Sequence, residues 1–190
     1  QPRSRGLGDV YKRQPYGYTN FYVDTEGFLK YEAQNEIRVI ARNSDQPNSR
    51  WYSGTGIYRP VYLWTGDQKY IPVNGIRIHT VSYAPAEIEV EIKTSCLGRV
   101  KAEVLDKENC ILTQEVENTG HPSVFRMEIP NAKLWNAEHP NLYLAEVTLY
   151  SGGKAVDTVT ESYGLRVIEI DPARGLLING EPVSYTHLRA

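Results

Sequence analysis

Residues that could do chemistry gather between Asn48 and Arg59, in the run NSRWYSGTGIYR. Trp51 and Tyr52 supply flat rings beside the guanidinium group of Arg50. Flat rings with polar edges suit sugars, because a sugar ring has an apolar face and a polar rim. Aromatic side chains also pack at the edges of β-sandwiches, and the residue types alone favour that structural interpretation.

Carboxyl groups that could work as an acid/base pair are harder to find. Glu87, Glu89 and Glu91 share one face of an alternating segment, which is typical of a solvated strand face. The other acidic residues considered are scattered over turns and strands: Asp106, Glu108, Glu115 and Glu117. No neighbouring pattern would raise the pKa of one carboxyl and lower that of another. We therefore predict no catalytic residue within the chain.

Metal and cofactor sites are not predicted either. The four histidines, His79, His121, His139 and His187, lack metal-ligand spacing, and the chain contains no HExxH motif or phosphate-binding loop. Cys96 and Cys110 are the only cysteines and lack CxxC spacing. A disulfide between them stays open but is not favoured.

Composition excludes several classes of partner. The chain has 190 residues, enough for one or two small domains, with 41% hydrophobic and 23% charged residues. A formal net charge of -2 gives no electrostatic footprint for nucleic acid or for an anionic membrane. No apolar run in the sequence is long enough to span a bilayer. The cellular compartment, cytoplasmic or periplasmic in a bacterium, stays open.

Hydrophobic alternation predicts an all-β chain whose first part, residues 15–66, is the end of a β-sandwich. We expect strands at Phe21–Asp24, Asn35–Arg42 and Arg59–Trp64, with Ile37, Val39 and Ala41 facing inward. Between the first two, Thr25–Tyr31 should form a turn with Phe28 and Leu29 packed inward.

Residues 67–166 predict a complete two-sheet sandwich, because short alternating strands and turns recur about every 8–12 residues. The inward sets are Ile76 and Ile78; Ile88, Val90 and Ile92; Val100, Ala102 and Val104; Phe125, Met127 and Ile129; and Tyr143, Ala145, Val147 and Leu149. A turn at 151–153 leads into a last strand, Lys154–Tyr163. Trp135 should close one end of the sandwich, and His139-Pro140 should set a turn.

Residues 167–183 predict a β-hairpin that leaves the sandwich. Val167–Ile170 is followed by a turn at 171–175 and by the segment LLINGEPV. Asn179-Gly180 favours a tight type I′ turn, since both residues accept the positive φ angles that this turn requires.

Three motifs in this chain resemble family 2 glycoside hydrolases, the β-galactosidase and β-glucuronidase group. NSRWYSGTGIYR, at 48–59, is similar to the end of that family's sugar-binding domain. LWNAEHPNLY, at 134–143, is similar to its immunoglobulin-like domain. YGLR at 163–166 and GLLINGEPV at 175–183 are similar to the beginning of its catalytic barrel. The resemblance runs from about residue 15 to residue 183, with the motifs in the family's order.

The resemblance implies a division of the chain. Residues 15–66 would be the last part of a jelly-roll sugar-binding sandwich, 67–166 an immunoglobulin-like sandwich, and 167–183 the first hairpin of a (β/α)8 barrel. The family's two catalytic carboxylates lie in that barrel, which would begin after Val183. The ends, 1–14 and 184–190, do not resemble the family and read as translated adapter sequence rather than native protein.

The implied function is hydrolysis of terminal β-linked sugars by a longer parent enzyme, with β-galactosidase favoured. Asn48, Arg50, Trp51 and Tyr52 would form a lip of the substrate pocket, and packing between domains explains them equally well. The chain alone should be inactive, and the carbohydrate substrate would bind to the parent enzyme through the barrel. A homo-oligomeric parent stays open. The alternatives are a carbohydrate-binding module and a purely structural immunoglobulin-like module.

Overall fold

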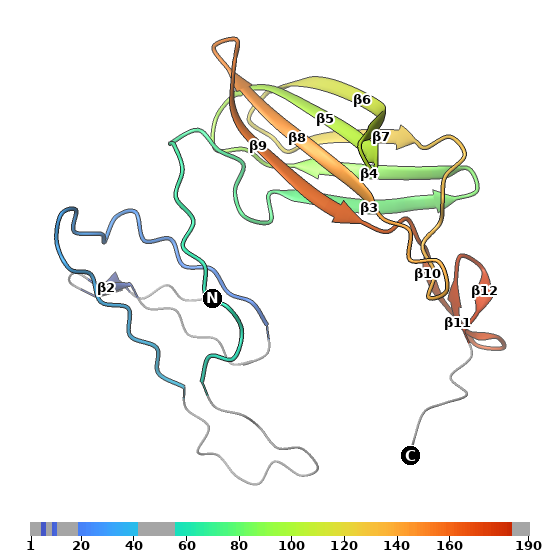
Figure 1. Cartoon of the computed structure of the whole chain (residues 1–190), viewed down its shortest axis with the longest axis horizontal. Helices are drawn as coiled ribbons and strands as arrows, with labels where there is room; N and C mark the ends of the chain where they lie inside the picture. The colour runs from blue at the N-terminus through green and yellow to red at the C-terminus, as the bar shows by residue number, and fades with distance from the viewer. Residues whose placement is uncertain (1–4, 7–8, 11–18, 42–55, 184–190) are drawn as a thin grey trace, which may run out of the picture. The chain divides into compact units, whose positions relative to one another are not determined.

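A computed structural model of the chain describes residues 5–6, 9–10, 19–41 and 56–183 (Figure 1). The chain divides into two compact units, Gln1–Tyr62 and Leu63–Ala190. All regular structure in the described residues is antiparallel β-sheet, as the sequence predicts, and these residues form no helix. Accordingly, the described part of the chain contains no helix with the length and apolarity to cross a membrane.

The first unit contains far less sheet than predicted. Its described strands are the two-residue pair β1 (Arg5–Gly6) and β2 (Asp9–Val10). The strands expected at 21–24, 35–42 and 59–64 are absent wherever those residues are described, so these predictions are wrong. Ile37, predicted to face inward, is 80% exposed. Alternation makes a strand only where a neighbouring strand takes its backbone hydrogen bonds, and none of the described sheets includes these segments.

The turn predicted at Thr25–Tyr31 does form. The backbone N–H groups of Phe28 and Leu29 both donate to the carbonyl oxygen of Thr25, at 2.9 and 3.1 Å. The two side chains are exposed, however, and not packed inward as expected. A turn needs only local hydrogen bonds, whereas inward packing needs a core, and no residue within 19–41 or 56–62 is buried.

The second unit contains a sandwich of two antiparallel sheets that lie face to face (Figure 1). The three-stranded sheet has the order β3 (Ile76–Tyr83), β4 (Ala86–Ile92), β7 (Ser123–Glu128). The four-stranded sheet has the order β6 (Asn109–Asn118), β5 (Gly98–Asp106), β8 (Tyr143–Ser151), β9 (Lys154–Tyr163).

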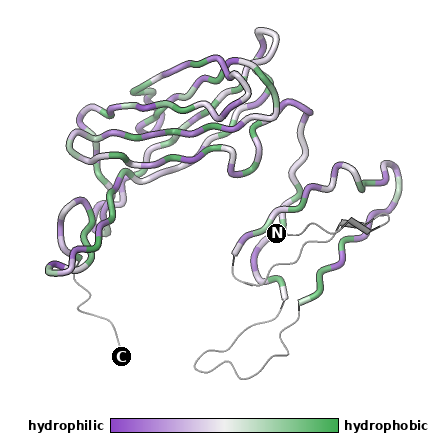
Figure 2. Tube along the Cα trace, turned by 180° about the vertical axis from the view of Figure 1, so that it is seen from behind, coloured by the Kyte–Doolittle hydropathy of each residue, from purple (hydrophilic) through white to green (hydrophobic). Residues whose placement is uncertain are grey.

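One hydrophobic core fills the space between the sheets, as the alternation predicts. Along these strands apolar and polar residues alternate, which Figure 2 shows as a change of colour from residue to residue. The predicted inward residues of β4, β5, β7 and β8 are all buried, together with Ile129, and Ile76 and Ile78 pack against them from β3. The alternation of apolar and polar residues therefore predicts correctly which side chains are buried wherever a second sheet covers the apolar face.

Strand β6 was not predicted from the sequence. Its residues show little alternation, and most of them are exposed. It lies at the edge of the four-stranded sheet and pairs with β5 in an antiparallel register, for example Val100 with Val116, which shifts between Val104 and Leu105. An edge strand gains its backbone hydrogen bonds from one neighbour and contributes little to the core, so its side-chain pattern is weak.

Beyond the sandwich, three short strands form a separate sheet. The order is β10 (Ile168–Asp171), β11 (Gly175–Ile178), β12 (Glu181–Pro182). Asn179 and Gly180 connect β11 to β12 with φ angles of 53° and 78°, as a type I′ turn requires. The hairpin predicted at 167–183 is confirmed, with its tight turn at the predicted residues.

Candidate functional site

The predicted substrate-binding residues Asn48, Arg50, Trp51 and Tyr52 lie outside the described residues. Their contact with a sugar therefore stays a prediction. The described part of the same motif resumes at Gly56 and includes Arg59. The guanidinium carbon of Arg59 lies 5.2 Å from the centre of the Tyr58 ring, and Arg59 donates a 3.2 Å hydrogen bond to the side-chain oxygen of Asn20.

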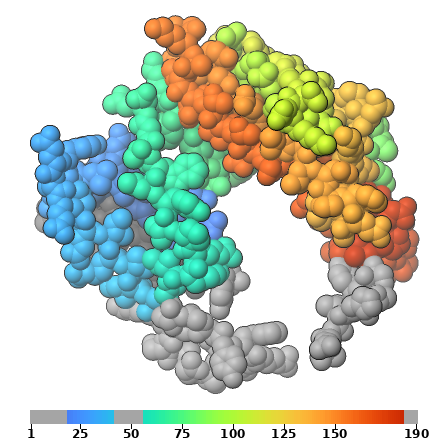
Figure 3. Space-filling view, in the orientation of Figure 1, coloured from blue at the N-terminus to red at the C-terminus, as the bar shows by residue number. Residues whose placement is uncertain are grey.

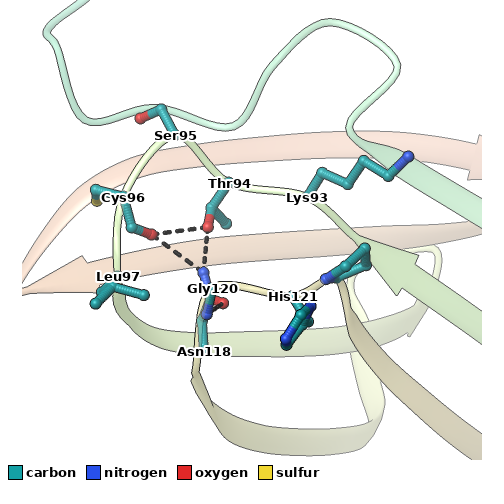
Figure 4. Close-up of a pocket in the computed structure, with 9 residues that line it drawn as sticks. Lys93, Thr94, Ser95, Cys96, Leu97, Asn118, Gly120 and His121 are labelled. Carbon is teal, nitrogen blue, oxygen red and sulfur yellow. Dashed lines mark hydrogen bonds between the residues drawn. The ribbon is translucent and has the colours of Figure 1, made fainter.

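The larger described cavity is a groove of about 390 Å³ at one end of the sandwich, here called the end groove. It lies between the loop that follows β4 and the loop that follows β6 (Figure 4). The Asn118 amide donates to the Cys96 carbonyl oxygen at 3.1 Å and also to the Thr94 hydroxyl. The Gly120 N–H in turn donates to the Asn118 oxygen at 2.9 Å. Asn118 thus ties the two loops together.

The polar groups of the end groove are largely occupied by this loop structure. The Ser95 hydroxyl donates to the carbonyl oxygen of Gln68 at 3.0 Å, and the Lys93 ammonium is 3.5 Å from a carboxylate oxygen of Glu91. In Figure 4 the Lys93 side chain extends away from Asn118. The lining contains the imidazole of His121 but no carboxyl group and no Trp, Tyr or Phe ring. The groove therefore lacks the carboxyl pair of a retaining glycosidase and the broad aromatic face on which a sugar ring stacks.

A smaller cavity of about 220 Å³, the edge cleft, lies between strands β3 and β9. Its lining contains one carboxyl group, Glu161, together with Tyr163 and the apolar side chains Ile76 and Ile78. The Tyr163 hydroxyl is buried and has no protein partner, and burial raises the pKa of this phenol, with a further contribution from Tyr143. Retaining glycoside hydrolysis requires two carboxyl groups about 5–5.5 Å apart, so one carboxyl is insufficient.

The acidic strand face is a structural feature. Glu89 accepts a 3.0 Å hydrogen bond from Arg126 on the neighbouring strand β7. Elsewhere, the pKa of Asp171 is lowered because its carboxylate accepts backbone hydrogen bonds from Arg174 and Ala173 in the β10–β11 turn. A lowered pKa suits a fixed anion rather than a proton donor. Neither described cavity brings two carboxyl groups together, and no metal-binding cluster of His, Cys, Asp or Glu occurs in the described residues.

Trp135 is at the end of the sandwich where the chain leaves β9, near its predicted place. Its N–H donates to the carbonyl oxygen of the fully buried Leu165 at 2.9 Å. The guanidinium carbon of Arg166 lies 4.4 Å from the centre of the Trp135 ring. The His139-Pro140 turn also forms, with the Asn136 side chain accepting from the N–H of His139. Sequence reasoning missed Arg166 as a partner of Trp135, because spatial pairing across 31 positions leaves no local signal.

The two cysteines are free thiols in the structure, Cys96 half-buried in a loop and Cys110 exposed on β6. The Cys110 thiol lies 3.3 Å from the Thr113 hydroxyl and donates to the Leu112 carbonyl oxygen at 3.4 Å. These contacts belong to an edge strand and form part of neither cavity.

The described residues thus form an all-β structure with a seven-stranded sandwich, and neither of its two cavities holds a pair of carboxyl groups. Comparison with known proteins supplies the family. A family profile named glycosyl hydrolases family 2 matches residues 74–166, which include the whole sandwich from β3 to β9.

Two curated relatives match nearly the whole chain. A putative β-glucuronidase from Formosa agariphila is 33% identical over 183 residues, covering 93% of this chain and 18% of the relative. A β-galactosidase from Bacteroides ovatus is 28% identical, covering 88% of this chain and 21% of the relative. The chain therefore spans about a fifth of the length of these curated relatives.

Among solved structures, a family 2 glycosyl hydrolase from Bacteroides cellulosilyticus is similar with a TM-score of 0.67 and 24% identity. The match covers 88% of this chain and 25% of that chain, and at this identity it shows the fold alone. With the family profile and the curated relatives, these matches show that the chain belongs to glycosyl hydrolase family 2, as a segment covering a small part of its relatives. The resemblance found in the three motifs is confirmed.

Proposed function

We propose that this chain is the non-catalytic part of a longer retaining β-glycosidase that cleaves terminal β-linked sugars. The observation that supports this most is the combination of family 2 membership with two cavities that hold one carboxyl group between them. Retaining hydrolysis uses a nucleophilic carboxylate and an acid/base carboxyl. Both would be supplied by a (β/α)8 barrel that follows the hairpin, at the carboxyl ends of its strands.

The same proposal assigns the parts of the chain. Residues 15–66 would complete a jelly-roll sugar-binding domain, 67–166 would form an immunoglobulin-like domain, and 167–183 would open the barrel. The antiparallel sandwich with three and four strands supports the second assignment. The sequence of the two ends, 1–14 and 184–190, supports their interpretation as adapter-derived tails.

For the substrate we propose a β-galactoside, with a β-glucuronide as the second candidate. The motifs resemble the β-galactosidase and β-glucuronidase group as a whole, and the names of the relatives include both enzymes, which supports both candidates. A carbohydrate-binding module without catalysis remains the alternative from another class. It predicts saturable sugar binding by the chain itself, which a titration followed by NMR would detect.

The activity test compares two proteins with p-nitrophenyl β-D-galactoside and p-nitrophenyl β-D-glucuronide. The 190-residue chain should release no nitrophenol above the blank. The same chain extended through a barrel should hydrolyse one of the two. Turnover by the short chain, or none by the extended one, would contradict the proposal.

Within that parent enzyme we propose that Arg50 and Asn48 hydrogen-bond sugar hydroxyls, while Trp51 and Tyr52 shape the rim. Arg50→Ala should lower kcat/KM about tenfold or more in the extended enzyme, since a hydrogen bond to a charged group contributes about 1.5–3 kcal/mol. Unchanged kinetics would remove Arg50 from the site and favour domain packing as its role.

A further inference from the structure

We propose that Asn179 is a positioning residue that holds the β10–β12 sheet in one fixed orientation on the sandwich. Both elements belong to the second unit, and Figure 3 shows the red end of the described chain lying against the gold segment that contains Trp135. Asn179 occupies the first central position of the β11–β12 turn, with φ at 53°. What this fixed orientation means for catalysis rests on the proposed function, but the contacts of Asn179 do not.

The side chain of Asn179 makes contacts in two directions. Its amide nitrogen donates to the carbonyl oxygen of Trp135, 44 residues earlier, at 3.0 Å. Its amide oxygen accepts from the N–H of Val167 at 3.0 Å, and its own backbone N–H donates to the Val167 carbonyl oxygen at 2.9 Å. One side chain therefore joins the end of the sandwich, the segment 164–167 between β9 and β10, and the hairpin turn.

Two glycines allow the close approach of these elements. A Cβ atom at Gly180 would lie 2.6 Å from the Tyr83 hydroxyl of β3, so the hairpin turn abuts the sandwich directly. A Cβ atom at Gly164 would lie 2.6 Å from Cδ1 of the Trp135 ring. Such distances are shorter than carbon van der Waals contacts, so only glycine fits without displacement. The backbone of residues 164–167 and of the β11–β12 turn thus packs directly against the sandwich.

Further contacts resist rotation of the hairpin about its connection. The N–H of Arg166 donates to the Thr80 hydroxyl on β3 at 3.3 Å, and its guanidinium covers the Trp135 ring. Leu165 and Leu177, on either side of the connection, are 0% and 1% exposed. A connection anchored by buried side chains, a ring contact and a bridging amide at separate points has one preferred orientation. In the longer enzyme proposed above, a barrel joined to this hairpin would take its orientation from it.

The test substitutes Asn179→Asp, which keeps the turn and the acceptor for Val167 but removes the donor to Trp135. The matched control is Asn141→Asp. The Asn141 amide donates to the adjacent carbonyl oxygen, that of Leu134, at 2.9 Å, but spans only the local loop. Both variants thus gain one negative charge and lose one amide-to-carbonyl hydrogen bond, and the two carbonyl acceptors, those of Leu134 and Trp135, are neighbours in the same loop.

Orientation is measured as the distance distribution between spin labels at Gln114 on β6 and Glu169 on β10, both exposed, in a background with Cys96→Ser and Cys110→Ser. Asn179→Asp should broaden or shift this distribution, and Asn141→Asp should leave it unchanged. Hydrogen exchange of the β10–β12 amides should become roughly tenfold faster in Asn179→Asp, the factor expected for one lost hydrogen bond.

Amides of β5 and β8 serve as the check on folding and should keep their protection in both variants. An unchanged distance distribution in Asn179→Asp would overturn the proposal, and so would equal broadening in Asn141→Asp. Loss of protection throughout the sandwich in Asn179→Asp would also overturn it, since Asn179 would then stabilise the core rather than orient the hairpin. None of these measurements uses enzyme activity, so the proposal for Asn179 can be overturned while the proposed glycosidase function stands.

Discussion

Tyr143 and Tyr163 form a stacked pair across β8 and β9, with ring centres 5.8 Å apart, yet their hydroxyls have opposite environments. The Tyr143 hydroxyl accepts a 2.8 Å hydrogen bond from the N–H of Lys133. The Tyr163 hydroxyl is buried without a protein partner. A desolvated hydroxyl without a hydrogen bond destabilises the folded state, whereas one with a bond contributes to it.

Phenylalanine at these two positions should therefore have effects of opposite sign. Tyr163→Phe should raise the free energy of unfolding by about 1 kcal/mol, and Tyr143→Phe should lower it by a similar amount. Denaturant unfolding followed by circular dichroism measures both. A loss of stability in Tyr163→Phe would mean that water in the edge cleft already satisfies the hydroxyl.

The same tyrosine predicts an alkaline limit of stability. Because burial raises the pKa of Tyr163, this phenol ionises more readily in the unfolded chain than in the folded one. The unfolding free energy is therefore unaffected by its ionisation below the ordinary tyrosine value of 10.0 and declines as pH rises above that value. The unfolding free energy of the wild-type chain should fall more steeply above pH 10 than that of Tyr163→Phe.

At the scale of elements, strand β4 shows how one strand presents two faces. Ile88, Val90 and Ile92 are buried in the core, while the glutamates between them face outward beside β3 and β7. In the register with β7, Val90 lies opposite the buried Phe125, and the next pair places Glu91 opposite the exposed Val124. Two valines on neighbouring strands thus sit on opposite faces of the same sheet.

This contrast gives a matched pair of substitutions. Val90→Ala should lower the free energy of unfolding by about 2 kcal/mol, because it removes two buried methyl groups from a filled core. Val124→Ala, with a side chain that is 53% exposed, should change it by less than about 0.5 kcal/mol. Equal effects in thermal unfolding would contradict the assignment of the β4 face to the core.

For the molecule as a whole, the two units differ in kind. Every buried apolar side chain among the described residues lies between Ile71 and Leu177, in the second unit. In the first unit, apolar residues such as Ile37 and Val61 are more than two-thirds exposed, at 80% and 73%. Burial of apolar area is the main favourable contribution to folding, so the second unit should carry the cooperative stability of the chain.

Hydrogen exchange followed by mass spectrometry tests this difference in one experiment. Peptides from β4, β5 and β8 should exchange slowly, through unfolding of the sandwich. A peptide covering 36–41 should exchange at nearly the rate of an unstructured chain, because the described structure gives no backbone hydrogen bond to these residues. Slow exchange throughout 36–41 would show that this segment has hydrogen-bond partners beyond those described.

The sequence by itself determined the interior of the sandwich, the Asn179-Gly180 turn and the family, because alternation, turn residues and short motifs are local signals. It also suggested strands in the first unit that do not form, since local alternation cannot state whether a partner strand is present. Only the tertiary structure decided that β6 pairs with β5, and that Asn179 reaches the Trp135 carbonyl across 44 residues. Such contacts depend on how distant segments are brought together by burial of the core, and that arrangement has no counterpart in the spacing of neighbouring residues.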